Sequence, residues 1–175
     1  MNVNLSKSQY YRSFYSGNDA RNAESRDGMT RGSLMNADTK ALTKAITTFS
    51  GLFKEEGISG KDLYNAIQAF GDTYNNTLSS SSDSGSHRVD QLVKNIKGLS
   101  AKEKKSLEEI GISVKESGKL SVDKEKLASA SPNKVKKLFG EDSEFMKQLK
   151  PYIRSLGRES STIDLQARAF FVHNA

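Results

Sequence analysis

The side-chain types that most often carry out catalysis are present in this sequence, but their spacing favours no reaction. The two histidines, His87 and His173, have no second histidine or carboxylate at the spacing of metal ligands. Adjacent carboxylates occur at residues 55–56 and 108–109. Adjacent residues on a helix point in different directions, so these pairs suit general acid and base catalysis poorly.

The remaining signatures of enzymes are also missing from the sequence. Cysteine is absent, so the chain has no thiolate nucleophile and no thiolate metal ligand. The serines at residues 79–86 lack a Gly-x-Ser-x-Gly turn and a partner base, and no nucleotide-binding glycine pattern occurs. We therefore expect a protein that is not an enzyme, with no catalytic, cofactor-binding or metal-binding residues and no cofactor.

Lysines form the strongest charge feature of the chain. Residues 88–137 contain 13 Lys or Arg against 7 Asp or Glu, a surplus of 6 that equals the net charge of +6. The lysines that could contact the phosphates of a nucleic acid are Lys102, Lys104, Lys105, Lys134, Lys136 and Lys137. Carboxylates alternate with them, and no aromatic residue lies among them to stack on a base. A solvated surface of mixed charge is therefore favoured, and a cytoplasmic basic adaptor or nucleic-acid-binding module is the alternative function.

The stretch at residues 107–127 carries the clearest local signals. Ser100 and Glu103 predict a capping box that opens a helix, and Gly111 ends that helix. Two alternating runs around a glycine-containing loop then predict a β-hairpin, and Asp123 predicts the N-cap of the next helix. Since a lone hairpin is marginally stable in water, this one must lie on helices. The predicted core of this region is Leu107, Ile110, Ile112, Val114, Leu120, Val122, Leu127, Leu138 and Phe139.

Several of these runs resemble the C-terminal region of bacterial flagellar filament cap proteins, also called hook-associated protein 2. They are Leu-Glu-Glu-Ile-Gly-Ile at 107–112, Gly-Lys-Leu-Ser-Val-Asp at 118–123, Lys-Leu at 126–127, Val-Lys-Lys-Leu-Phe at 135–139 and Ala-Phe-Gly-Asp-Thr-Tyr-Asn at 69–75. The resemblance covers about residues 60–156, and its motifs are structural. It implies a structural protein of the bacterial flagellum that is exported without a cleaved signal peptide, with flagellar components as possible partners. Cap proteins are usually several times longer than this chain.

A helical pattern precedes the hairpin region. Apolar residues from position 41 to 53 and again from 63 to 78 follow helical spacing, and the short turn between them predicts an antiparallel pair of helices. In the second helix the apolar spacing is close to that of a coiled coil, which favours self-association or a protein partner. The candidate interaction face consists of Leu63, Tyr64, Ile67, Phe70 and Tyr74.

The predicted fold is mainly α with a minor α+β part, in a chain of 175 residues that suits one domain with tails. No apolar run is long enough for a membrane span or a secretory signal peptide, so we expect no membrane contact. The polar residues 1–36, with one aromatic cluster at 10–15, predict a disordered arm. The predicted order after that arm is a helical hairpin at 37–79, a Ser-rich linker at 80–86, a basic helix and β-hairpin module at 87–157, and a C-terminal tail at 158–175.

Overall fold

The structure is a computed structural model that describes residues 9–17, 20, 23–53 and 59–173. Within these residues the elements are α1 (Gln9–Phe14), α2 (Ala23–Asp27), α3 (Arg31–Leu52), α4 (Gly60–Ser81), α5 (His87–Lys102), α6 (Lys104–Glu108), β1 (Ile112–Val114), β2 (Leu120–Val122), α7 (Lys124–Ser129), α8 (Pro132–Phe139) and α9 (Glu144–His173). The two strands form an antiparallel sheet. The prediction of a mainly α fold with a small β-hairpin is confirmed.

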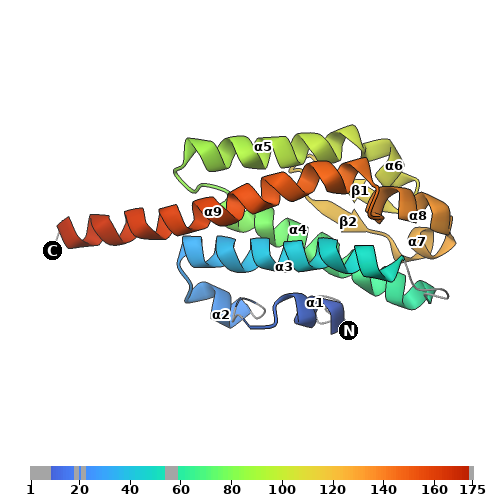
Figure 1. The fold of residues 1–175 in the computed structure, drawn as a ribbon, viewed down its shortest axis with the longest axis horizontal. Coiled ribbons are helices and arrows are strands. Elements are labelled where there is room, and N and C mark those ends of the chain that lie inside the picture. The colour runs from blue at the N-terminus through green and yellow to red at the C-terminus, as the bar shows by residue number, and fades with distance from the viewer. Residues whose placement is uncertain (1–8, 18–19, 21–22, 54–58, 174–175) are drawn as a thin grey trace.

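Four long helices run side by side along the long axis of the molecule (Figure 1). The helices α3 and α4 are antiparallel, as the short turn between them predicted, and α9 packs against both α3 and α5. The short helices α1 and α2 lie along α3, while the hairpin, α6, α7 and α8 gather at one end of the long helices. No helix in the part of the chain that the structure describes is both long enough and apolar enough to cross a membrane.

The helix boundaries follow the capping residues, with one exception. Asp123 accepts hydrogen bonds from the backbone N–H groups of Glu125 and Lys126, and Pro132 occupies the first turn of α8, both as predicted. The predicted capping box at Ser100 is wrong, because α5 continues to Lys102. Ser100 is buried in α5 with its Oγ 2.7 Å from Tyr74 Oη. A hydroxyl with this buried partner has no need to cap a helix.

A single hydrophobic core joins the two halves of the chain, which corrects the predicted division into a hairpin and a separate basic module. The ring of Phe139 on α8 lies 5.0 Å from Phe49 on α3, 5.3 Å from Phe70 on α4 and 6.5 Å from Phe145 on α9, measured between centroids. These four side chains, called the aromatic cluster below, unite four helices. Aromatic pairs at these separations contribute beyond the area that they bury.

The predicted Ser-rich linker at 80–86 is shorter than expected. The helix α4 continues through Ser81, and both Ser80 and Ser81 are buried. The turn that follows uses positive φ angles at Asp83 and Gly85, after which Ser86 caps α5. Low sequence complexity suggested a flexible segment, but small hydroxyl side chains also allow helices to pack closely.

The prediction of a disordered arm at residues 1–36 is wrong for the part that the structure describes. Residues 9–14 and 23–27 form α1 and α2, and α3 begins at Arg31. Tyr11, Phe14 and Tyr15 are buried in the core. These three aromatic side chains bury apolar surface, although the average composition of residues 1–36 is polar. Residues 1–8 lie outside the described residues.

The predicted tail at 158–175 is also corrected, because α9 continues to His173. Its Asp164 accepts hydrogen bonds from the hydroxyls of Thr30 (2.6 Å) and Ser33 (3.3 Å) at the start of α3. Gly32 makes this approach possible, since a Cβ there would lie only 2.5 Å from the carbonyl oxygen of Ser160. The last residues, 174–175, lie outside the described residues.

Truncation of Phe139 tests whether the chain has one core. Phe139→Ala removes the ring shared by four helices, and we expect a loss of about 3–5 kcal/mol in the free energy of unfolding. The exposed Lys136→Ala, on the same helix, should change it by less than about 0.5 kcal/mol. Urea unfolding followed by circular dichroism measures both values. A Phe139→Ala protein that melts in two separate transitions would contradict a single core.

Candidate interaction surfaces

The side chain of Asn75 on α4 fixes the β-hairpin in place. Its Nδ2 donates to the carbonyl oxygen of Leu120 and its Oδ1 accepts from the N–H of Leu120, both at 2.8 Å. One amide thus satisfies both backbone groups of a residue in β2, as a neighbouring strand would. The strands pair in the register Ile112↔Val122 and Val114↔Leu120. The helix α4 therefore supplies the support that a two-stranded hairpin needs.

The hairpin also depends on its connection to the helices around it. Gly111 has a φ of +82°, and a Cβ there would lie 2.8 Å from the backbone nitrogen of Leu127. Of the predicted core residues, Val114 and Val122 are half-buried and pack against the core. The buried ones are Leu107, Ile110, Ile112, Leu120, Leu127, Leu138 and Phe139.

The predicted interaction face on α4 is closed by the protein itself, which corrects that prediction. Ile67, Phe70 and Tyr74 have no exposed surface, and Tyr64 is 6% exposed. Lys124 of α7 places its Nζ 5.8 Å from the centre of the Tyr64 ring, and β2 and α7 pack on α4. Only Leu63 is half-buried. The apolar spacing identified a packed helix face, but the partners of that face are intramolecular.

The lysines considered for nucleic-acid binding lie among carboxylates on a surface of mixed charge. Lys104 and Lys105 lie on α6, which packs against α8 with Lys134, Lys136 and Lys137. Lys134 Nζ is 2.7 Å from Glu109 Oε2, and Lys104 Nζ is 3.8 Å from Glu108 Oε1. The ion pair with Lys134 lowers the pKa of the Glu109 carboxyl. These cations are therefore partly neutralised within the chain.

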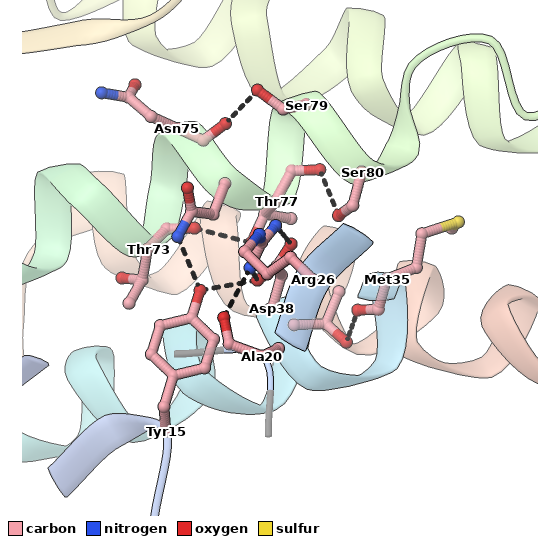
Figure 2. Close-up of polar contacts among 12 residues, drawn as sticks. Tyr15, Ala20, Arg26, Met35, Asp38, Thr73, Asn75, Thr77, Ser79 and Ser80 are labelled. Carbon is pink, nitrogen blue, oxygen red and sulfur yellow. Dashed lines mark hydrogen bonds and ion pairs between the residues drawn. The ribbon is translucent and has the colours of Figure 1, made fainter. Parts of the chain in front are cut away.

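A buried polar network joins the N-terminal helices to α3 and α4 (Figure 2). Asp38 on α3 is fully buried and accepts two hydrogen bonds of 2.8 Å from the guanidinium of Arg26. It also accepts one of 2.6 Å from the hydroxyl of Tyr15, and the amide of Asn76 donates to that same hydroxyl at 2.9 Å. Arg26 Nη1 also donates to the carbonyl oxygen of Ala20 at 3.0 Å. We call Tyr15, Arg26, Asp38 and Asn76 the polar network.

Ionisation is suppressed at Tyr15, which belongs to the polar network, and at Tyr11, which lies beside it. Burial is the main cause that raises the pKa of the Tyr15 hydroxyl, and the charge of Asp38 raises it further. Burial likewise raises the pKa of Tyr11, while the hydrogen bond from Asn76 opposes the shift. The hydrogen bonds to Asp38 raise the pKa of Arg26. A neutral Tyr15 hydroxyl and a charged Arg26 guanidinium are thus maintained over the whole physiological range.

The sequence held only one signal for this network, the group of aromatic residues at positions 10–15. The spacing of Tyr15, Arg26, Asp38 and Asn76 along the chain predicts no contact among them. The groups considered for catalysis remain apart as well, since His87 begins α5 and His173 ends α9. The described residues include no group of three or more His, Cys, Asp or Glu that could hold a metal ion.

Asp72 on α4 is the other carboxylate with an unusual environment. Gln68 donates to its Oδ1 at 3.2 Å, while its Oδ2 is buried with no hydrogen-bond partner among the described residues. Burial disfavours the charged form and raises the pKa of Asp72 from 3.8 to about 6, although the hydrogen bond from Gln68 acts against the shift.

Comparison with known proteins finds a match to a family model over the C-terminal half of the chain. Residues 84–170 match the family model described as flagellar hook-associated protein 2 C-terminus. The match starts just before α5, includes the hairpin and ends within α9. It confirms the resemblance seen in the sequence runs, although α4 with its residues 69–75 lies outside the matched part. Searches of curated proteins and of solved structures find no match to this chain.

Loss of one partner of Asp38 should be costly. Arg26→Met leaves a buried carboxylate without its cation, and we expect the free energy of unfolding to fall by about 3–5 kcal/mol. The matched control is Arg88→Met, which breaks an ion pair with Glu159 whose arginine side chain is 73% exposed. That control should cost less than about 1 kcal/mol. Chemical denaturation would measure both, and equal losses would show that the network contributes no more than a surface pair.

The environment of Asp72 predicts a pH dependence of stability. Its pKa of about 6 in the folded chain exceeds the unfolded value of 3.8, so the unfolded state loses its proton first as the pH rises. The contribution of Asp72 is therefore most favourable below about pH 4, decreases between about pH 4 and 6, and is constant above.

Asp72→Asn removes this dependence. The variant should be more stable than the wild type at pH 7 by about 1–2 kcal/mol, and the difference should vanish at pH 4. Denaturation curves of both proteins at several pH values give this difference. A gain that stays the same at pH 4 and pH 7 would contradict the role of ionisation.

Proposed function

We propose that the protein assembles with other proteins as a cap-like component of a flagellum, on the basis of the match between residues 84–170 and the family model of the flagellar hook-associated protein 2 C-terminus. Its role in this proposal is structural, and it acts by binding protein partners rather than by catalysis. The single observation that carries the proposal is the family match, because it covers the hairpin, the short helices and most of α9.

The architecture of the matched region supports a structural role. The helices α5 and α9 pack together, and α8 packs on α9. Leu107, Ile110, Val135 and Leu138 are buried in this region, so its apolar residues serve folding. The described polar side chains form no arrangement that could bind a metal ion. Such a unit would interact with other proteins through a rigid surface.

The outer end of α9 is the part that we assign to assembly. It projects beyond the other long helices (Figure 1). Leu165 on α9 is 67% exposed. Among the side chains that the structure describes, it is the one large apolar side chain that is exposed. The helix continues to His173, and in proteins most of the stability of a helix comes from packing against a neighbour. A second copy of the chain or another flagellar component would supply that neighbour.

The proposed location follows from the same family match. We place the protein at the bacterial flagellum and propose that it is exported there without a cleaved signal peptide. The genomic neighbourhood tests this part, since genes for flagellar components beside the gene are expected. A genome with no flagellar genes would contradict the location.

Sedimentation velocity of the full chain over a range of concentrations tests the assembly. Apolar burial drives association in this proposal, so oligomers should persist between low and moderate salt. Leu165→Glu should shift the distribution to the monomer, whereas Gln148→Glu, an exposed change near the other end of α9, should leave it unchanged.

Titration with labelled DNA and RNA in the same buffers tests the alternative function. Nucleic-acid binding through the lysines would weaken steeply as salt rises. A chain that is monomeric at every concentration and binds nucleic acid in this way would overturn the proposed function.

A further inference from the structure

A groove runs between α3 and α9 on the face of the molecule that borders the N-terminal helices. It has a volume of about 570 Å³ and is lined by α3, by α9 and by the turn after α1. Its floor includes the buried side chains of Ala37 and Ile153, which are 4% and 1% exposed. This depth comes from small residues on both helices, and Gly157 lies so close to α3 that a Cβ on it would be 3.3 Å from Thr39 Oγ1.

Four cations surround this groove, two on each helix. Lys40 and Lys44 are one turn apart on α3, and Arg154 and Arg158 are one turn apart on α9. Residues four apart on a helix share a face, so each helix presents a pair of cations to the same groove. All four side chains are exposed.

Among the residues that the structure describes, the lining of the groove offers no matching anions, because it contains no Asp or Glu. Lys44 Nζ donates to the carbonyl oxygen of Ser16 at 2.9 Å and to its hydroxyl at 3.1 Å. In the part of the chain that the structure describes, none of the four cations forms an ion pair. This arrangement differs from the α6 and α8 surface, where Lys104 and Lys134 face carboxylates of the same chain.

We infer that this cationic groove binds an acidic segment of a protein partner, with Lys40, Lys44, Arg154 and Arg158 contacting its carboxylates. Guanidinium groups bind carboxylates in a bidentate manner, which suits Arg154 and Arg158 for this contact. Unpaired cations of one sign in a concave surface also raise the local concentration of anionic ligands. The inference does not rest on the flagellar assignment, because α3 lies outside the matched residues.

The shape and composition of the groove favour a peptide over other anions. Nucleic acids without base pairing are held by aromatic side chains that stack on bases, and no aromatic residue lines this groove. Its apolar floor, with Ala37 and Ile153, suits the methylene groups and small side chains of a polypeptide.

Fluorescence anisotropy of the full chain with a short fluorescein-labelled oligoglutamate peptide tests the inference. We compare the wild type with Lys40→Gln/Lys44→Gln/Arg154→Gln/Arg158→Gln. The matched control, Lys102→Gln/Lys105→Gln/Lys119→Gln/Lys136→Gln, removes the same charge from exposed positions elsewhere. The groove variant should lose at least about tenfold in affinity and the control less than about twofold. An oligoglutamine peptide should not bind the wild type.

Three results would overturn the inference. Equal losses in both variants would show that the peptide responds to net charge alone. Absence of wild-type binding at low salt would remove the site. Loss of self-association in the groove variant, with the peptide still bound, would assign the groove to a second copy of the chain.

Amide NMR of the wild type gives a measurement that does not depend on whether the variants fold. Addition of oligoglutamate should shift signals of Lys40, Lys44, Gly157 and Arg158 and leave those of the α6 and α8 lysines in place. Shifts confined to α6 and α8 would contradict the proposed site. A labelled single-stranded RNA added in place of the peptide should produce no shifts in the groove, and strong shifts there would assign it to nucleic acid instead.

Discussion

The packing of Phe139 against Phe49, Phe70 and Phe145 is the interaction on which the rest of this structure depends. These rings come from two pairs of consecutive helices, α3 with α4 and α8 with α9, and their contact brings the N-terminal pair of helices together with the C-terminal region. Because the same cluster connects these four helices, the two halves of the chain share one core. One core therefore extends across the serine run, although the sequence suggested a helical hairpin separated from a basic module.

The hairpin is attached to this core by a polar contact rather than by apolar area alone. Its strands have three residues each, which is too short for independent stability. Asn75 occupies the position of a third strand by bonding to both backbone groups of Leu120. The matched family region starts after Asn75, so in this chain a residue outside that region holds its hairpin in place. This dependence explains why α4 has no free face for partners.

The polar network attaches the N-terminal segments to α3. A buried carboxylate is tolerated only with a partner, and Asp38 obtains its partners from segments that precede α3. These segments cover α3 on one side, while α9 covers it on another. Two accessible surfaces are the projecting end of α9 and the cationic groove between α3 and α9. Both lie on α9, so this helix connects the core to the surfaces that we assign to partners.

The sequence by itself determined the local elements, because periodicity and capping depend on neighbouring residues. It predicted the antiparallel pair α3 and α4, the hairpin with Gly111 and Asp123 at its ends, and the resemblance of the C-terminal half to flagellar hook-associated protein 2. Only the tertiary structure decided which surfaces are covered, since burial depends on contacts between distant residues. Apolar spacing marks Phe70 and Tyr74 as packed without saying against what, and their partners proved to be intramolecular.

The polar network and the cationic groove were beyond prediction for the same reason. Tyr15, Arg26, Asp38 and Asn76 share no spacing that a local pattern could reveal, and they meet only because the core places their helices together. In the sequence, the two cations on α3 and the two on α9 have the pattern of ordinary solvated side chains. They line one groove only because the two helices pack side by side. Local physical chemistry acts over a few residues along the chain, whereas a binding surface is made by segments that only folding brings into contact.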